Sequence, residues 1–422
     1  MKKPWVAVAA GSVAVMTACS GGVTSPGEDE SPEPVAEACS EFQRRDLVAP
    51  FDTEGDCLLV PKMTVAHGNV GVGFTEYPLG SYFVDLTTGA TTELELPEET
   101  REPQAVVAPV NGEPMFLVTG YEYRDGDAFN ASGAAPFALG FDLQGDPSPI
   151  YRATAEWIGH AVTERLVTET DVWIWSGALD LESETWTEVR FDGYVSEIEP
   201  YTQLDSGDPI AVFGGNLVHS MVSRARKDSE QIWVSGLYAV APDGSIAWTN
   251  LTESTEGFDE RDVVVGYLGR YVLILTATED GAWQVAWYDG VTGEKAVPEA
   301  ADLVGHTGLV PRDTEHLPLV VTDDGAFVVL NARPRYRDLV IGIDVEAGTA
   351  TTLPSENDLE FTAVDGTTVY LRSSHRHTAT YDLTTGEAVP LPESTKIPHL
   401  TTDRAVVFEN VLDEELDFLV TR

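Results

Sequence analysis

The sequence predicts an all-β fold, a β-propeller of four-stranded blades, from three observations. Strand-like segments that alternate apolar with polar residues recur in pairs, each pair joined by a short turn that carries Gly or Asp. These hairpins return about every 50 residues, and repeats of 40–50 residues with four strands each are typical of propellers. Helical periodicity is almost absent, which excludes an α/β fold.

The chain begins with the features of an export signal. Lys2 and Lys3 precede an uncharged, largely apolar stretch over 4–18 that is too short to cross a membrane. A basic start, a short apolar segment and small residues before a cut site are typical of secretory signals. The sequence therefore predicts a signal peptide over residues 1–18.

Residues Met16-Thr17-Ala18-Cys19 resemble the lipobox of bacterial lipoproteins. The resemblance implies that Cys19 receives a diacylglycerol thioether, becomes the new N-terminus and is acylated again, typically with palmitate. Two or more acyl chains anchor a protein stably, whereas one does not. The predicted location is the extracytoplasmic face of the cell membrane; the alternative is an ordinary signal peptide that contains a cysteine.

Residues 19–38 are expected to join this lipid to the folded domain. Their Ser, Gly, Pro and Glu residues cannot bury enough apolar surface to fold. As a flexible acidic tether they would span roughly 20–25 Å on average.

Cys39 and Cys57 are predicted to form a disulfide, because exported proteins meet an oxidising compartment. Closing this short loop is worth about 3 kcal/mol in the chain-entropy model. It would pin the end of the tether to the first predicted strand, 57–61. The alternative, a metal-binding or catalytic thiol, has no cluster of other ligands near it in the sequence.

The propeller domain is assigned to 39–422. Its recurring hairpin supplies the third and fourth strands of a blade and occurs at 82–97, 138–153, 178–191, 237–252, 285–298, 341–354 and 379–392. Another hairpin precedes most copies and supplies the first two strands, as at 262–277, 317–332 and 359–373.

The tail, 399–422, matches only the first three strands of the unit. Since an open sheet edge invites aggregation, the missing strand is expected from the N-terminal side, near 57–61. Seven full copies and this composite blade make eight, closed by the two ends of the chain. Seven blades is the alternative, if 157–191 is not a blade of its own.

The turns Asp85-Leu86-Thr87-Thr88-Gly89 and Asp382-Leu383-Thr384-Thr385-Gly386 resemble the repeat of quinoprotein-type (PQQ-like) propellers. The resemblance covers roughly residues 60–422 and implies the propeller fold. In that family a Trp four residues after the Gly docks one blade on the next, and here only Trp248, after Gly244, fits. We therefore predict the family's fold but no quinone and no other cofactor.

The formal charge of −45 indicates what the protein does not bind. Nucleic-acid affinity comes from neutralising phosphates with basic side chains, so DNA and RNA are excluded as partners. No nucleophile elbow, zinc-binding helix, P-loop or dinucleotide loop is present. The sequence predicts no catalytic set and no metal site.

Basic residues are scarce but gather between the second and third strands of the repeats. Strand direction alternates within a blade, so these loops all emerge on one face of the disc. Arginine suits carboxylate and phosphate groups. The predicted anionic-ligand face comprises Arg224, Arg226, Lys227, Arg333, Arg335, Arg337, Arg372 and Arg376, with Arg124 in an equivalent position.

Together these features predict a lipid-anchored binding or assembly module whose partner is an envelope polymer or the acidic patch of a protein. The alternative is an enzyme with its site in the central channel, either a quinone-dependent dehydrogenase or a glycan-cleaving activity. The fold does not decide between them.

Overall fold

A computed structural model of the chain is all-β, as the sequence predicts, and its helix α2 (Ala300–Leu303) is a single turn. The residues that the structure describes are 42, 47–48, 51, 57–76, 79–98, 100–110, 113–124, 133–154, 165–167, 171–174, 177–180, 186–188, 197–204, 207–255, 264–277, 283–303, 316–332, 339–353, 359–373, 377–392, 395–410 and 416–422.

Three four-stranded antiparallel sheets follow one another in the first half of the chain. The first contains β2 (Met63–His67), β3 (Val70–Glu76), β4 (Leu79–Asp85) and β5 (Thr91–Glu93). The second contains β6 (Thr100–Val110), β7 (Glu113–Arg124), β8 (Gly133–Phe141) and β9 (Tyr151–Thr154). The third contains β10 (Arg165–Val167), β11 (Asp171–Ile174), β12 (Gly177–Asp180) and β13 (Trp186–Glu188).

The next sheet has six strands, because a two-strand segment precedes its four-stranded core. The segment is β14 (Glu197–Ile198) and β15 (Tyr201–Thr202). The core is β16 (Asp208–Phe213), β17 (Asn216–Lys227), β18 (Glu230–Val240) and β19 (Ile246–Ser254).

An eight-stranded sheet comes next and consists of two consecutive four-strand sets. The first set is β20 (Val264–Leu268), β21 (Tyr271–Ala277), β22 (Trp283–Asp289) and β23 (Lys295–Ala296). The second is β24 (His316–Val321), β25 (Phe327–Ala332), β26 (Leu339–Asp344) and β27 (Thr349–Thr352). Two residue pairs between β22 and β27 join the sets.

Four more strands, β28 (Leu359–Asp365), β29 (Thr368–Ser373), β30 (Thr378–Asp382) and β31 (Ala388–Leu391), form a separate sheet. The last sheet contains β32 (Leu400–Thr401), β33 (Ala405–Glu409) and β34 (Leu416–Thr421). Its fourth strand is β1 (Cys57–Pro61), which pairs antiparallel with β34 along its whole length. We call these four strands the closing sheet. The prediction that 57–61 completes the C-terminal unit is confirmed.

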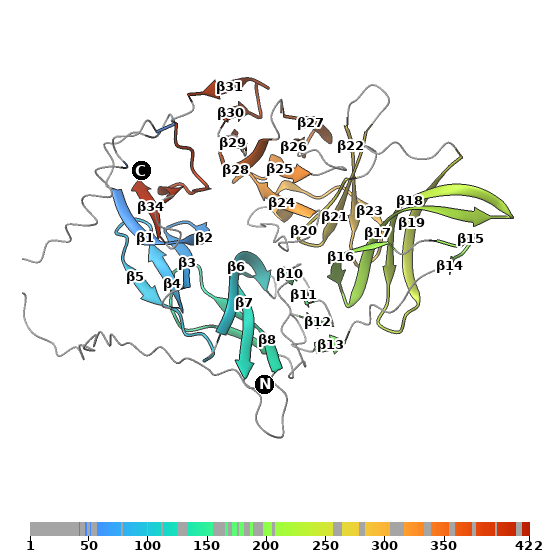
Figure 1. Ribbon diagram of the computed structural model, residues 1–422, viewed down its shortest axis with the longest axis horizontal. Helices are drawn as coiled ribbons and strands as arrows, with labels where there is room; N and C mark the ends of the chain where they lie inside the picture. Colours follow the sequence, from blue (N-terminus) through green and yellow to red (C-terminus); the bar gives the residue numbers. More distant parts are fainter. Residues whose placement is uncertain are drawn as a thin grey trace, which may run out of the picture.

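The sheets follow one another around a common centre, so that the colours of Figure 1 run once around the molecule and red β34 lies beside blue β1. The first strands of neighbouring sheets contact each other, as β2 does with β6 and with β32, and as β28 does with β32. The first strands therefore line the inside of the ring. This is a propeller-like arrangement.

The hydrophobic core is divided among the spaces between neighbouring sheets. Phe83 of the first sheet lies 5.6 Å from Phe116 of the second, measured between ring centroids. Phe213 of β16 and Tyr267 of β20 meet across a later junction, with their ring centroids 6.4 Å apart. Because side chains alternate between the two faces of a strand, a sheet presents apolar side chains to the neighbouring sheets on both of its sides.

The recurring aspartates close the turns between third and fourth strands. Asp85 Oδ1 accepts hydrogen bonds from the backbone N–H groups of Thr87 and Thr88, at 2.8 and 3.0 Å. Asp382 Oδ1 accepts the corresponding bonds of Thr384 and Thr385. The pKa of both carboxyl groups is lowered, chiefly by hydrogen bonds from Thr87 to Asp85 and from Thr385 to Asp382. The motif thus has a structural role here.

Trp248 docks β19 on the next set of strands. Its indole Nε1 donates a hydrogen bond to the carbonyl oxygen of Gly290, 3.2 Å away. Gly293 has φ 72°, and a Cβ at this position would lie 2.6 Å from the indole ring. Glycine is required both by this backbone conformation and by the close approach of the ring.

Candidate functional site

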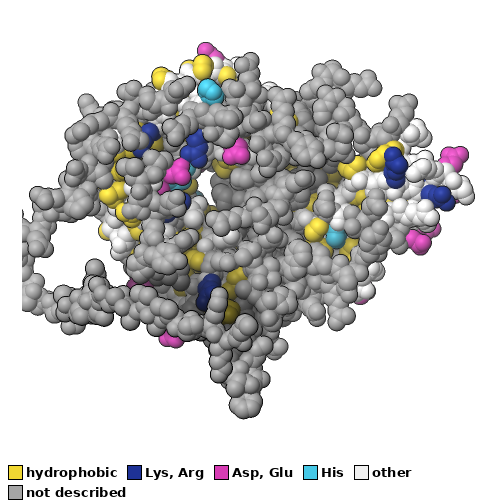
Figure 2. All heavy atoms as spheres, viewed as in Figure 1, with side chains coloured by type: hydrophobic (Ala, Val, Ile, Leu, Met, Phe, Trp, Pro, Cys, Tyr) yellow, Lys and Arg dark blue, Asp and Glu magenta, His cyan; other side chains and the backbone are white. Residues whose placement is uncertain are grey.

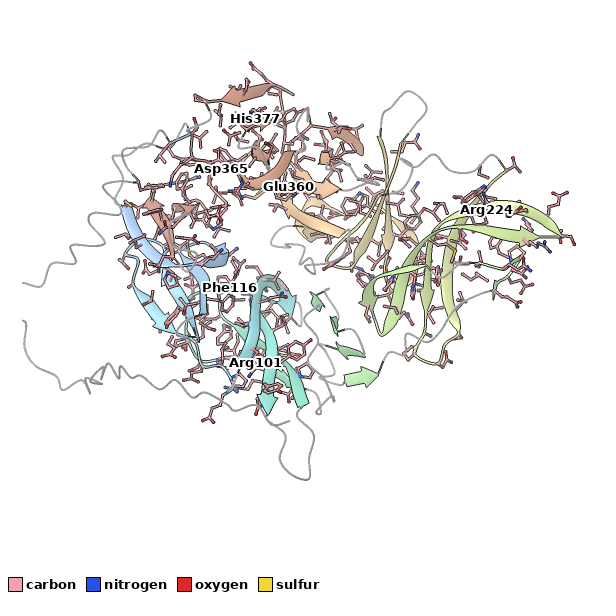
Figure 3. The ribbon with its side chains drawn as sticks, in the orientation of Figure 1. Arg101, Phe116, Arg224, Glu360, Asp365 and His377 are labelled. Carbon is pink, nitrogen blue, oxygen red and sulfur yellow. The ribbon has the colours of Figure 1, made fainter. Side chains whose placement is uncertain are left out.

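The predicted basic residues that the structure describes lie in two separate places. Arg224, Arg226 and Lys227 are at the end of β17, and Arg372 is on β29. Figure 3 shows Arg224 far from Glu360, the cross-strand partner of Arg372. The other predicted members, Arg333, Arg335, Arg337 and Arg376, lie outside the described residues, and of Arg124 only the backbone, the last position of β7, is described.

Strands β17 and β18 form a long hairpin that projects from the ring at the right of Figure 1. We call it the basic hairpin. Its register runs without interruption from Leu217 opposite Val240 to Lys227 opposite Glu230. The two turn residues, Asp228 and Ser229, both have positive φ, 50° and 75°, as tight two-residue hairpin turns require.

One face of the basic hairpin is packed. Met221, Ala225, Ile232 and Val234 point to this side and are buried beneath β14, β15 and the residues that follow them. The cover adds the side chains of Ile198, Tyr201 and Leu204. This apolar packing supports a hairpin that extends beyond β16.

The opposite face is exposed and carries the basic side chains. Arg224 and Arg226 are exposed, and Val222 beside them is 47% exposed. The guanidinium of Arg224 lies over the ring of Trp233, 4.8 Å from its centroid. This contact holds the long Arg side chain along the sheet and leaves its donors available to solvent.

Lys227 does not contribute an available charge to this face. Its Nζ lies 2.5 Å from Glu253 Oε1, which also accepts a hydrogen bond of 2.9 Å from the Tyr201 hydroxyl. The bond from Lys227 lowers the pKa of the Glu253 carboxyl, while burial and then Glu253 raise the pKa of Tyr201 to about 12. Lys227 and the cover residue Tyr201 are therefore both bound to Glu253 of β19, and Arg224 and Arg226 are the cations directed outward.

A second group of charged residues lies at the inner side of the ring. Lys62 and His399 immediately precede the first strands β2 and β32, and Glu360 lies on the first strand β28. Across the closing sheet Glu409 faces Asp417. With Arg372, these residues form the inner charged cluster: Lys62, Glu360, Arg372, His399, Glu409 and Asp417.

In the inner charged cluster Lys62, Glu360 and Arg372 are exposed, and His399 and Glu409 are partly buried. Arg372 Nη1 donates a 2.8 Å hydrogen bond to Glu409 Oε2, and this bond is the main cause of the lowered pKa of Glu409. Positive charges on His399 and Lys62 act in the same direction. Figure 2 shows an opening near the middle of the molecule with Lys or Arg, Asp or Glu, and His side chains around it.

Asp417 is the exception, because it is 1% exposed. Its Oδ2 accepts a hydrogen bond of 2.8 Å from the backbone N–H of Met63 and lies 3.3 Å from His399 Nε2. Its Oδ1 has no hydrogen-bond partner in the part of the chain that the structure describes. Sequence reasoning missed this residue; the signal available was a carboxylate inside an otherwise apolar run, 416–420.

Other site predictions fall partly outside the described residues. Cys57 is the first residue of β1, whereas Cys19 and Cys39 are outside, so lipidation and the disulfide stay predictions. Within the described ranges no three His, Cys, Asp or Glu side chains are grouped so that they could hold a metal ion. The same ranges contain no helix long and apolar enough to span a membrane.

Comparisons with known proteins identify similar solved structures but no family. No family model matches the chain, and no curated protein does. Apo AztD from Citrobacter koseri is 12% identical, with 85% of this chain and 90% of that chain covered and a TM-score of 0.39. An oligogalacturonate lyase from Vibrio parahaemolyticus is 11% identical, with 87% and 98% covered and a TM-score of 0.33. BamB from Moraxella catarrhalis is 16% identical, with 76% and 82% covered and a TM-score of 0.28. Likenesses this distant carry no information about activity or ligand.

Proposed function

We propose that this protein is a lipid-anchored binding module of the cell envelope and that its basic hairpin binds an anionic envelope polymer. The observation that carries the proposal is the exposed pair Arg224 and Arg226 on a chain whose formal charge is −45. A site that binds an anion on this protein must overcome the repulsion between that anion and the many acidic side chains elsewhere on the chain. Two guanidinium groups, of which that of Arg224 is held over the Trp233 ring, supply that local attraction.

The geometry of the pair favours a polymer. Arg224 and Arg226 are two positions apart on one strand, so their Cα atoms are separated by about 7 Å and their side chains share a face. Repeated carboxylate or phosphate groups along a linear chain match such a row. Val222 and Trp233 add apolar surface for the uncharged parts of the repeating unit.

We also propose that the ring consists of eight four-stranded blades. The support is the division of the strands into consecutive sets of four, with the sheet of eight strands counted as two sets and β14 and β15 counted as an addition. In this arrangement strands β10 to β13 form the third blade. Seven blades would require these strands to belong to a neighbouring set.

The position in the cell follows from the proposed lipid on Cys19, which leaves residues 20–38 as a tether before the domain. The proposed disulfide between Cys39 and Cys57 fastens the tether to β1. Mass spectrometry of the intact protein from membranes tests both modifications. A chain that begins at Cys19, with the added mass of a lipid and without two hydrogens, is expected.

A glycan-cleaving enzyme is less well supported. Its general acid would be a carboxyl group whose pKa is raised by burial or by a neighbouring negative charge. Among the described carboxyl groups, each one with a shifted pKa has it lowered by hydrogen bonds or basic neighbours, as Glu253, Asp289 and Glu409 show.

The binding proposal is tested with full-length protein in detergent, using polyglutamate and polyphosphate as immobilised probes. The double variant Arg224→Ser/Arg226→Ser is expected to lose about tenfold or more in affinity for the probe that the wild type binds. The matched control, Arg152→Ser/Arg404→Ser, removes two exposed arginines elsewhere and should bind like wild type.

Binding to the polymer should also weaken as salt is added, since the contact is made by exposed charges. Equal affinities of the hairpin variant and the control would refute the proposal. If crosslinking through the hairpin in intact cells recovers only a protein, the ligand is an acidic protein surface and not a polymer.

A further inference from the structure

The buried Asp417 joins three segments that are distant in the sequence. It lies on β34 in the closing sheet, accepts the N–H of Met63 at the start of β2, and lies 3.3 Å from His399, just before β32. Met63 belongs to the first sheet of the ring and His399 to the last. Asp417 is therefore a contact across the junction where the ring closes.

The carboxylate is poorly compensated while His399 is neutral. One N–H group donates to Oδ2, and Oδ1 has no partner among the described residues, although the side chain is 1% exposed. Burying a charge without a hydrogen-bonded counter-charge is costly. A protonated imidazole at the existing distance would supply the missing positive charge.

The other charged groups facing this pair come from every strand that surrounds it. Glu409 is on the neighbouring β33 and is paired with Arg372 of β29. Glu360 is on β28, opposite Arg372, and Lys62 is on the link between β1 and β2. Counting Asp417, three carboxyl groups and two basic side chains surround His399.

We propose that protonation of His399 tightens the closure of the ring by pairing the imidazolium with the buried Asp417 carboxylate. The junction is then firmer in an acidic medium, in which histidine side chains carry a proton, than in a neutral one. The device is independent of the basic hairpin, which lies elsewhere on the ring.

Hydrogen exchange on the full-length protein in detergent tests this proposal at pH 5.5 and 7.5, after correction for the intrinsic effect of pH. In the wild type, amides of β1 and β34 are expected to be roughly three- to tenfold better protected at pH 5.5, the range that a charge-assisted hydrogen bond produces. Amides of β7 and β8, away from the junction, should show no such difference.

His399→Gln is expected to abolish the pH difference in β1 and β34. His67→Gln, which removes an exposed histidine at the end of β2, is the matched control and should retain it. Asp417→Asn should also abolish it, but the conclusion does not depend on that variant, which removes a buried charge. Equal pH dependence in wild type and His399→Gln, or an equal difference in β7 and β8, overturns the proposal.

Discussion

The closing sheet and the basic hairpin are both antiparallel, but they use their two faces differently. The closing sheet is packed on both sides: Leu419 faces the cluster that includes Val84, and Phe418 faces Phe42. The basic hairpin is packed on one side only, and Arg224 occupies its free side. A face that contacts no neighbouring sheet can carry side chains chosen for binding.

The largest loss of stability is expected when apolar volume is removed from the closing sheet. Leu419 is 0% exposed, so Leu419→Ala should lower the free energy of unfolding by about 3–4 kcal/mol through lost burial and a cavity. Val389→Ala on β31 removes a 46% exposed side chain and should change it by less than about 0.5 kcal/mol. Chemical denaturation of both variants measures the two values; similar losses would contradict the described packing.

A smaller loss of stability is expected at the contact between the sheet that contains the basic hairpin and the set of strands that follows it. Trp248→Phe keeps an aromatic ring beside Gly293 but removes the indole donor to the Gly290 carbonyl. The expected loss is about 1 kcal/mol, the typical net value of one hydrogen bond. Trp248→Ala should cost clearly more, and a phenylalanine variant as unstable as the alanine variant would show that the ring contributes little.

Alkaline pH tests the fastening of the hairpin to its cover. Because the pKa of Tyr201 is raised from 10 to about 12 in the folded state, the unfolded chain loses this proton first, and stability falls between these two pH values. Tyr201→Phe should lose less stability over that interval than the wild type does. Denaturation at pH 9 and pH 11 measures the difference; identical losses in both proteins would contradict the raised pKa of Tyr201, which burial causes first and the hydrogen bond to Glu253 second.

The smallest effect on stability is expected on the free face of the hairpin. Arg224→Ser/Arg226→Ser should change the free energy of unfolding by less than about 0.5 kcal/mol for each residue, since both side chains are exposed. The same variant should lose binding to the anionic probe. A large loss of stability would show instead that these arginines support the folded hairpin and do not serve binding alone.

Much of the fold could be predicted from local patterns in the sequence. Runs of β-branched and aromatic residues identify strands such as 368–373, and the Asp-to-Gly spacing identifies turns such as 85–89, because both signals depend on neighbours in the chain. The pairing of 57–61 with the C-terminal strands was predictable from counting: the last unit lacks one strand, and an unpaired edge is unfavourable.

The sites could be predicted only in part. Arg224 and Arg226 are found by counting basic residues in an acidic chain, but the sequence does not show that Lys227 is paired with Glu253, which lies 26 positions away. Arg372 was grouped with these residues by its place in the repeat, whereas its partner Glu409 belongs to the closing sheet. Such pairings depend on which sheets become neighbours, and a local pattern does not contain that information.

The origin of the closing sheet has a consequence for how the chain reaches its native state. Met63 and Asp417 are separated by 354 positions, and β1 cannot find its partner until residues near 420 have been made. Contacts this remote in sequence form slowly, because a very long loop must be ordered to make them. Until then β1 remains an unpaired strand, a state in which a chaperone or a neighbouring copy could capture it.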